Sequence, residues 1–566
     1  MTRVNLRREP DLILHGGKII TLDARSSVVE AIAISGDIIL ALGSDQEILQ
    51  FASPATRCID LQGRAVVPGL HDGHAHMDRE GLKEIFPSLG RVESIADIQK
   101  AIAALAAKSE PGEWIVVMPL GTPPAYDGMP QALAEKRFPT RQELDAAAPE
   151  NPVYIRSIWG YWRHTLPLIS IANTRALELA GIGPDTAPPS PLVHFEKDEH
   201  GELTGVIREE TLMPIVELKY FRDCSRFPLS SRTESLPRSQ AAYHRYGTTS
   251  VFEGHGVATE VVESYKAMRA RNELTMRVGL VLSPNWKSVE TPSLDAFVEA
   301  WCGWLSGPGL GDQHLRMAGM FVDMGPDENN EIRAQAYPST GWAGFNYDTA
   351  RTRSRALELL KACARHRIQV VAIWPNMLEL FYAVHQEIPL NGQRWVLSHI
   401  STLSEREIGM IREMGLIVTT HTNRYLYKEG HLLLQKGGPG AEDDIVPLRS
   451  LTEAGVPVVL ASDNVPVTLF HPLWHAISRT SRSGAVIGAA QTLTREQALR
   501  CITVNGPLLT WEESRKGSLE VGKLADLAVL TADPLTCPEN EIKDIEAVMT
   551  LVGGQVVYRQ SDFGAV

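Results

Sequence analysis

Short apolar runs separated by turn residues fill both ends of the chain. Near the N-terminus they cover residues 11–23 and 31–43, where Gly-Gly and Gly-Asp pairs interrupt them; near the C-terminus they cover 523–534 and 545–560. Runs of this length bounded by such pairs are typical of strands joined by hairpins. The pattern predicts a small β-sandwich to which both chain ends contribute, with the middle folding as one inserted unit.

In the middle of the chain, short apolar runs alternate with stretches of helical periodicity, which is typical of a parallel sheet with helical crossovers. Eight such runs are present, and eight strands close a TIM barrel. They are residues 65–76, 247–255, 276–283, 316–325, 368–376, 394–401, 415–422 and 457–464. The predicted fold class is therefore α/β: a TIM (β/α)8 barrel with a composite β-sandwich.

A long stretch separates the first two predicted barrel strands. It spans about 80–240 and includes the aromatic segment SIWGYWRHT. We expect it to form an inserted subdomain that caps the mouth of the barrel. The expected boundaries are then 68–512 for the barrel with its insert, and 1–67 and 513–566 for the two parts of the sandwich.

Two histidines stand directly after the first predicted barrel strand, where TIM-barrel active sites lie. In an extended segment, residues two apart point to the same side, so His74 and His76 can converge on one ion in a geometry that zinc accepts. A His-x-His pair also occurs by chance as surface or core histidines. Its position at a strand end favours the metal site.

Other polar residues end the later predicted strands. Asp463 follows the eighth, where a carboxylate can ligate a metal and act as general base and then general acid, although alone it could be a helix N-cap or turn residue. His399 and His421 end the sixth and seventh strands. Either could be a further ligand or a donor that polarises the scissile carbonyl.

The composition excludes several classes of function. A net charge of -13 without any Lys/Arg-rich block argues against nucleic acid and against an acidic membrane surface as partners. No segment approaches the roughly 20 apolar residues of a membrane span, and the N-terminus lacks the apolar run of a signal peptide. Six cysteines without paired spacing disfavour disulfides and a cysteine zinc site. We expect a cytoplasmic protein with a small-molecule ligand.

The motifs together resemble the amidohydrolase superfamily. VVPGLHDGHAH, then LASDN far downstream, then KGSLEVGKLADLAVLTADP look like its family 3 branch, typified by N-substituted formamide deformylases. The resemblance implies a TIM barrel with a composite β-sandwich, and hydrolysis of an amide or related C–N bond by metal-activated water. It also implies a homodimer.

The chain departs from this branch at the second metal. The branch usually carries a carboxylated lysine that bridges two metals four residues before an aspartate, but here Gly319 precedes Asp323. Val371 stands where the branch has a metal-binding histidine on the fifth strand, and Trp374 where it has a glycine. Both lost ligands belong to the same metal, so we predict a mononuclear site.

The predicted site combines one ion, zinc or another divalent metal, with a few catalytic groups. The expected metal ligands are His74, His76, His399 and Asp463, with Asp463, His399 and His421 as catalytic residues. His421 replaces a glutamine of the branch and could take over part of what was lost. The residues expected to bind substrate are Trp159, Tyr161, Trp162, His164, Asp323 and Trp374.

Three alternatives stay open at this point. The aromatic residues could pack the insert onto the barrel and not touch substrate at all. The same metal site could run a decarboxylation, hydration or isomerisation, as some members of the superfamily do. A non-catalytic binding protein that keeps the fold is the third, although His74, His76, His399 and Asp463 would then have no reason to persist together.

Overall fold

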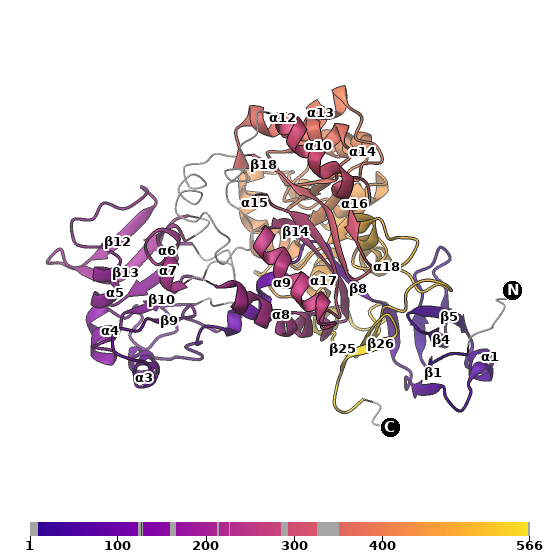
Figure 1. Cartoon of the computed structure of the whole chain (residues 1–566), viewed down its shortest axis with the longest axis horizontal. Helices are drawn as coiled ribbons and strands as arrows, with labels where there is room; N and C mark the ends of the chain where they lie inside the picture. Colours follow the sequence, from indigo (N-terminus) through magenta and orange to yellow (C-terminus); the bar gives the residue numbers. More distant parts are fainter. Residues whose placement is uncertain are drawn as a thin grey trace.

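A parallel barrel forms the centre of the molecule (Figure 1). The computed structural model describes residues 9–122, 126, 128–158, 166–211, 214–225, 227–284, 293–324 and 350–563. The barrel strands, in sheet order, are β8 (Leu70–Asp72), β14 (Thr248–Val257), β15 (Arg277–Leu282), β17 (Leu315–Phe321), β20 (Val370–Ile373), β21 (Val396–Ser398), β22 (Ile417–Thr420) and β23 (Val458–Leu460). All eight predicted strands are present, and the predicted fold class is confirmed.

Two backbone hydrogen bonds join the last strand to the first. Gly73 N donates to Leu460 O at 3.1 Å, and Asp463 N donates to His74 O at 3.1 Å. Since the second bond lies beyond the carboxyl ends of both strands, it brings the residues that follow β8 against those that follow β23.

Apolar side chains fill the barrel interior below these strand ends. They form one buried cluster: Phe252, Val281, Ala318, Phe321, Val371, Val396, Ile417, Val459 and Leu509. The interior is therefore a packed core, and polar chemistry is confined to the carboxyl-end mouth.

Helices surround the barrel and bury a larger apolar cluster against the outer faces of the strands. They include α8 (Leu229–His244), α9 (Thr259–Ala270), α10 (Leu294–Leu305), α12 (Arg353–Arg365), α13 (Leu378–Glu387), α14 (Glu405–Met414), α16 (Leu448–Glu453), α17 (Phe470–Ser478) and α18 (Arg495–Cys501). The limits of α14 follow from local chemistry: Ser404 and Glu407 form a capping box, and Gly415 ends the helix in the left-handed conformation at φ 65°.

Both ends of the chain build the sandwich. One sheet contains β1 (Leu12–His15), β4 (Ala31–Ser35), β5 (Ile38–Gly43) and β6 (Arg57–Asp60); the other contains β2 (Lys18–Ile20), β3 (Val28–Val29), β7 (Ala65–Pro68), β24 (Leu527–Leu530), β25 (Ala547–Val552) and β26 (Gln555–Arg559). In the second sheet β7 pairs with both β2 and β24, which unites the two termini. Buried residues of both sheets form one core.

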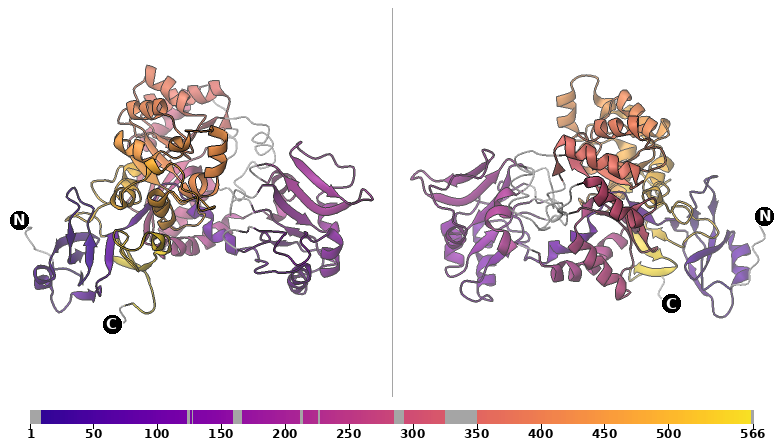
Figure 2. Two further views of the ribbon diagram at one scale, coloured as in Figure 1. Left: turned by 180° about the vertical axis from the view of Figure 1, so that it is seen from behind. Right: turned by 45° about the horizontal axis from the view of Figure 1, so that its top comes forward.

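The inserted segment has a sheet and a core of its own. Its strands are β9 (Ile115–Val117), β10 (Val153–Ile155), β11 (Leu168–Ala172), β12 (Val193–Lys197) and β13 (Leu203–Glu209), with α3 (Ile95–Ala106), α4 (Arg141–Ala147), α5 (Thr174–Leu179) and α6 (Ile215–Tyr220). It stands beside the barrel, on the side away from the sandwich (Figures 1 and 2). Capping of the mouth and the residue boundaries of the domains stay predictions. Among the described helices, none is long and apolar enough to cross a membrane.

A buried ion pair ties the barrel to the sandwich. Arg277 Nε and Nη2 lie 2.6 and 2.8 Å from the two carboxylate oxygens of Asp526, and both side chains are buried. Burial alone would raise the pKa of Asp526, but the adjacent Arg277 guanidinium holds it below its usual value. Gly553 N donates to the same carboxylate at 2.8 Å, so Asp526 joins three segments.

We expect Arg277→Ala to lower the free energy of unfolding by about 3–5 kcal/mol, because it leaves the Asp526 charge buried without its partner. Arg245→Ala is the matched control: it removes an exposed arginine that contacts Glu546 at 2.8 Å across the same boundary, and should cost at most about 1 kcal/mol. Urea titration followed by circular dichroism measures both. Equal losses of unfolding free energy in the two variants would show that the buried Arg277–Asp526 pair does not stabilise the boundary more than the exposed pair.

Candidate metal centre

Residues from the first and last barrel strands meet at the mouth. His74 and His76 follow β8, Asp463 follows β23, and all three are buried. His76 Nε2 lies 2.9 Å from Asp463 Oδ1, and His74 Nε2 lies 4.0 Å from the same oxygen. The Asp463 carboxylate, 387 positions after His76 in the sequence, thus shares one small volume with both imidazoles.

The histidines after β21 and β22 complete this group. His399 Nε2 lies 3.2 Å from His74 Nε2, and His421 Nε2 lies 3.8 Å from Asp463 Oδ2. The rings of His399 and His421 are in contact, with centroids 4.3 Å apart. The structure therefore brings together all five metal-binding and catalytic residues named from the sequence, while their roles stay predictions.

These side chains fit a divalent metal. His74, His399 and Asp463 offer one ligand atom each within 4.8 Å of one another, and so do His74, His76 and His255. Burial, followed by the nearby Arg79 charge, lowers the pKa of His76 well below its usual value, which favours the neutral imidazole that binds metals. Imidazole nitrogens with one carboxylate are a common donor set for catalytic zinc.

Left-handed backbone turns aim several of these residues. His399 has φ 64°, Asp463 φ 52° and Asn464 φ 62°, in a region that residues other than glycine rarely adopt. Such conformations cost of order 1–3 kcal/mol each and concentrate at functional sites. Asn464 also fixes its neighbour: its Oδ1 accepts from His76 N at 2.9 Å, and its Nδ2 donates to His76 O at 2.7 Å.

A second carboxylate, which the sequence analysis did not single out, lies beneath the histidines. Asp72 accepts hydrogen bonds from His74 N at 3.1 Å, Ser462 N at 3.1 Å and Ser462 Oγ at 2.5 Å. Burial raises the pKa of Asp72 to about 6 despite these donors. Asp72 therefore fixes the turn after β8 to the turn after β23.

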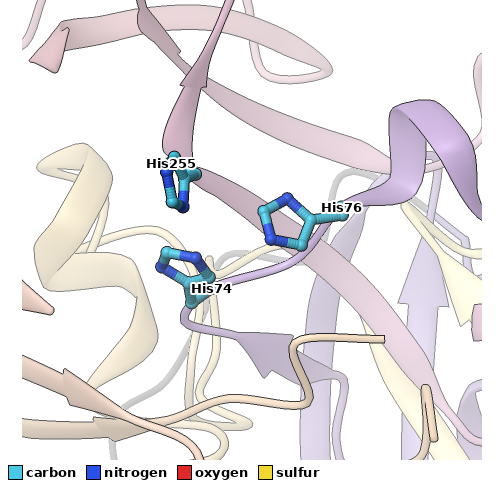
Figure 3. Close-up of side chains that lie close together, drawn as sticks. All are labelled: His74, His76 and His255. Carbon is cyan, nitrogen blue, oxygen red and sulfur yellow. The ribbon is translucent and has the colours of Figure 1, made fainter. Parts of the chain in front are cut away.

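His255 is a further histidine that the sequence analysis missed. It lies near the carboxyl end of β14, and its ring centroid is 5.9 Å from the centroids of both His74 and His76 (Figure 3). One feature of the sequence could have identified it: His255 ends the second predicted strand, just as the other site histidines stand at the ends of their strands. A lone histidine in a strand gives no other indication of a metal.

Two glycines make room for this arrangement. A Cβ at Gly254 would lie 2.7 Å from His74 Nδ1, so only glycine lets the His74 ring pack against β14. Gly256 has φ 79°, and the register of β14 against β15 shifts between Glu253 and Val257. A bulge of this kind re-aims side chains and is common beside active sites.

Glu253 lies beside His76. Its Oε2 lies 4.0 Å from His76 Nδ1, while its Oε1 accepts from Asp78 N at 3.0 Å and from Tyr265 OH at 2.5 Å. Burial and the adjacent Asp78 raise the pKa of Glu253 to about 8. Carboxylates behind metal-binding histidines commonly orient the ring.

Gly319 and Val371, the positions predicted to lack the second-metal ligands, lie against backbone and in apolar packing. A Cβ at Gly319 would lie 2.4 Å from Gln369 O, so no longer side chain fits there without movement. Val371 belongs to the apolar core inside the barrel. Neither position offers a ligand atom.

Two of the residues predicted to bind substrate belong to the described part of the chain. Asp323 lies in β18 (Asp323–Met324), where its Oδ1 accepts from Met324 N at 2.8 Å. Trp374 is partly buried against the apolar cluster around the barrel. The other four, Trp159, Tyr161, Trp162 and His164, fall outside the described residues. Their roles stay predictions.

Comparison with known proteins agrees with this geometry. The model of the amidohydrolase family matches residues 57–558. The chain belongs to the amidohydrolase family. This confirms the resemblance inferred from the motifs and supports a metal-dependent hydrolase.

Similar proteins align over nearly the whole chain. The N-substituted formamide deformylase of Arthrobacter pascens is 25% identical over 97% of this chain and 99% of its own length, and the putative amidohydrolase YtcJ of Bacillus subtilis is 22% identical over the same shares. Among solved structures, an uncharacterized metal-dependent hydrolase from Pyrococcus horikoshii has a TM-score of 0.64 at 17% identity, covering 94% of this chain and 99% of that one. It shares the fold.

We expect Gly254→Ala to weaken zinc binding by about 10-fold or more, because the added methyl group must displace the His74 ring. Gly409→Ala is the control, since a Cβ there meets nothing within 4 Å. Zinc affinity is measured by competition with a chromophoric chelator, and circular dichroism checks the fold. Equal affinities in the two variants would show that His74 does not need this close approach.

Proposed function

We propose that this protein hydrolyses a C–N bond of a small molecule, using one zinc ion held by His74, His76, His399 and Asp463. The supporting observation is the convergence of these four buried side chains from three strand ends, with His76 Nε2 at 2.9 Å from Asp463 Oδ1 and His399 Nε2 at 3.2 Å from His74 Nε2. Family membership supports hydrolysis. The relative named N-substituted formamide deformylase favours amides and formamides, with carbamates and cyclic amides next.

A single ion agrees with the residues around the centre. Gly319 and Val371 supply no ligand atom at the positions where the resemblance implies a bridging lysine and a histidine. Both would serve the same second metal. Their joint loss favours a site reorganised around one ion.

Asp463 is the proposed proton carrier. When bound, zinc supplies Lewis-acid activation of water, whose pKa falls from about 15.7 toward about 7. Asp463 accepts the proton released by the water as it attacks the carbonyl carbon. It then delivers this proton to the leaving nitrogen when the C–N bond breaks, so the carboxylate is regenerated.

His421 and Tyr425 complete the proposed machinery. His421 Nε2 lies 3.8 Å from Asp463 Oδ2, where it can donate to the oxyanion or relay the proton. Tyr425 OH lies 3.1 Å from His399 Nδ1. This hydrogen bond holds the ring so that the opposite nitrogen, Nε2, faces the other site histidines.

Substrate selection remains part of the proposal. An aromatic wall from Trp159, Tyr161, Trp162, His164 and Trp374 would suit an apolar or aromatic group on the substrate. We also retain Asp323 as a substrate-binding residue, a cytoplasmic location and a homodimer as proposals.

We expect Asp463→Asn to lower kcat by about 100- to 10,000-fold, because amide cannot act as a general base. Asp312→Asn, at a half-exposed carboxylate paired with Arg269, should leave kcat unchanged. The assay follows a panel of formamides, amides, carbamates and lactams in ¹⁸O-labelled water. Turnover without ¹⁸O in the product would point to a lyase or isomerase, and a fully active Asp463→Asn would exclude the proposed base.

We expect His421→Ala to lower kcat by about 100-fold or more while zinc content stays near one per chain, because His421 is proposed as a donor and not as a ligand. Elemental analysis and steady-state kinetics measure the two effects separately. Unchanged metal content together with unchanged activity would remove His421 from the mechanism.

A further inference from the structure

We propose that His255, at the end of the second barrel strand, is a direct ligand of the same ion as His74 and His76. The inference rests on the proposed metal site and adds a ligand that neither the motifs nor the resemblance assign. It makes the centre a cluster of four imidazoles and one carboxylate.

The position of His255 relative to the other rings carries the argument. Its ring centroid lies 5.9 Å from each of the centroids of His74, His76 and His399, so it is equidistant from all three. Its nitrogen lies within 4.8 Å of those of His74 and His76. Two nitrogens bound to one zinc at about 2.0–2.1 Å lie about 3–4 Å apart, a separation inside the 4.8 Å limit that the His255 nitrogen already meets.

The local structure of β14 holds the ring at this place. His255 is 8% exposed and stacks on Phe321, with centroids 5.0 Å apart and an interplanar angle of 28°. A Cβ at Gly256 would lie 2.8 Å from Phe321 Cβ, so glycine is needed for β14 to pass so close to β17. Together with the bulge, this packing directs His255 toward His74 (Figure 3).

The chemistry of the cluster favours a shared cation. The neutral imidazole nitrogens of this cluster bring their lone pairs close together. A divalent ion can accept all of these lone pairs at the same time. Four neutral imidazoles and one aspartate leave zinc with a net charge of +1, so it keeps its strength as a Lewis acid. His255 thus adds a fifth donor to the proposed site without adding a second metal.

The first test measures the zinc affinity of His255→Ala. Changes behind a metal ligand already weaken binding by about 10–100-fold, so the loss of a ligand should raise Kd by about 100-fold or more. His244→Gln is the matched control: His244 is also buried, but it contacts Thr248 O and Thr275 Oγ1 outside the cluster. The control should keep wild-type affinity.

The second test introduces a ligand that absorption spectroscopy can detect. His255→Cys loaded with Co²⁺ should show a thiolate-to-cobalt absorption band in the near ultraviolet that the wild-type Co²⁺ protein lacks, because a cysteine at a ligand position binds through its thiolate. This readout does not depend on activity. It also does not require His255→Ala to fold as well as the wild type.

The outcomes separate the ligand from the proposed function. Weaker zinc binding in His255→Ala together with the new band in His255→Cys supports ligation. Wild-type affinity in His255→Ala, or weaker affinity without the band in His255→Cys, overturns it and leaves the zinc hydrolase standing if the wild type holds one zinc. A wild-type protein that binds no zinc overturns both.

Discussion

The contact between the turns after β8 and β23 is the constraint on which the site depends. Asp72 receives three hydrogen bonds there, one from His74 N and two from Ser462, and Asp463 N donates to His74 O. These bonds replace the ladder that neighbouring strands share elsewhere in the barrel. These bonds involve the same turns that carry His74 and Asp463. The contacts that close the barrel therefore also place the residues of the candidate metal centre.

The proposal of a single metal agrees with the packing on the fourth and fifth barrel strands. At Gly319 the fourth-strand backbone lies against Gln369 O, and Val371 joins the apolar core. Gly254 and Gly256 let β14 pass close to His74 and Phe321. The histidines of the cluster follow or end the first, second, sixth and seventh strands, and Asp463 follows the eighth.

The sequence predicted the eight strands and the residues at their ends because both are local signals: an apolar run, then a polar residue at its carboxyl end. The composite sandwich followed in the same way from glycine-punctuated strands at both termini. Asp72 and His255 were missed for a physical reason. Their importance comes from contacts with Ser462 and His74, which are distant in the sequence. The bulge beside His255 lies in the register of β14 against β15, and the His255 ring stacks on Phe321 of β17, so neither feature is a local signal.

The two roles proposed for Asp463, metal ligand and general base, fit its geometry. One carboxylate oxygen faces His76 at 2.9 Å and the other faces His421 at 3.8 Å. A carboxylate placed symmetrically on a cation would have no oxygen left to carry a proton. Asp463 and Asn464 form a left-handed turn, and it leaves the two carboxylate oxygens facing different histidines, so one oxygen can bind the ion while the other takes part in proton transfer. We therefore propose that this strained turn is what lets one residue serve as both ligand and base.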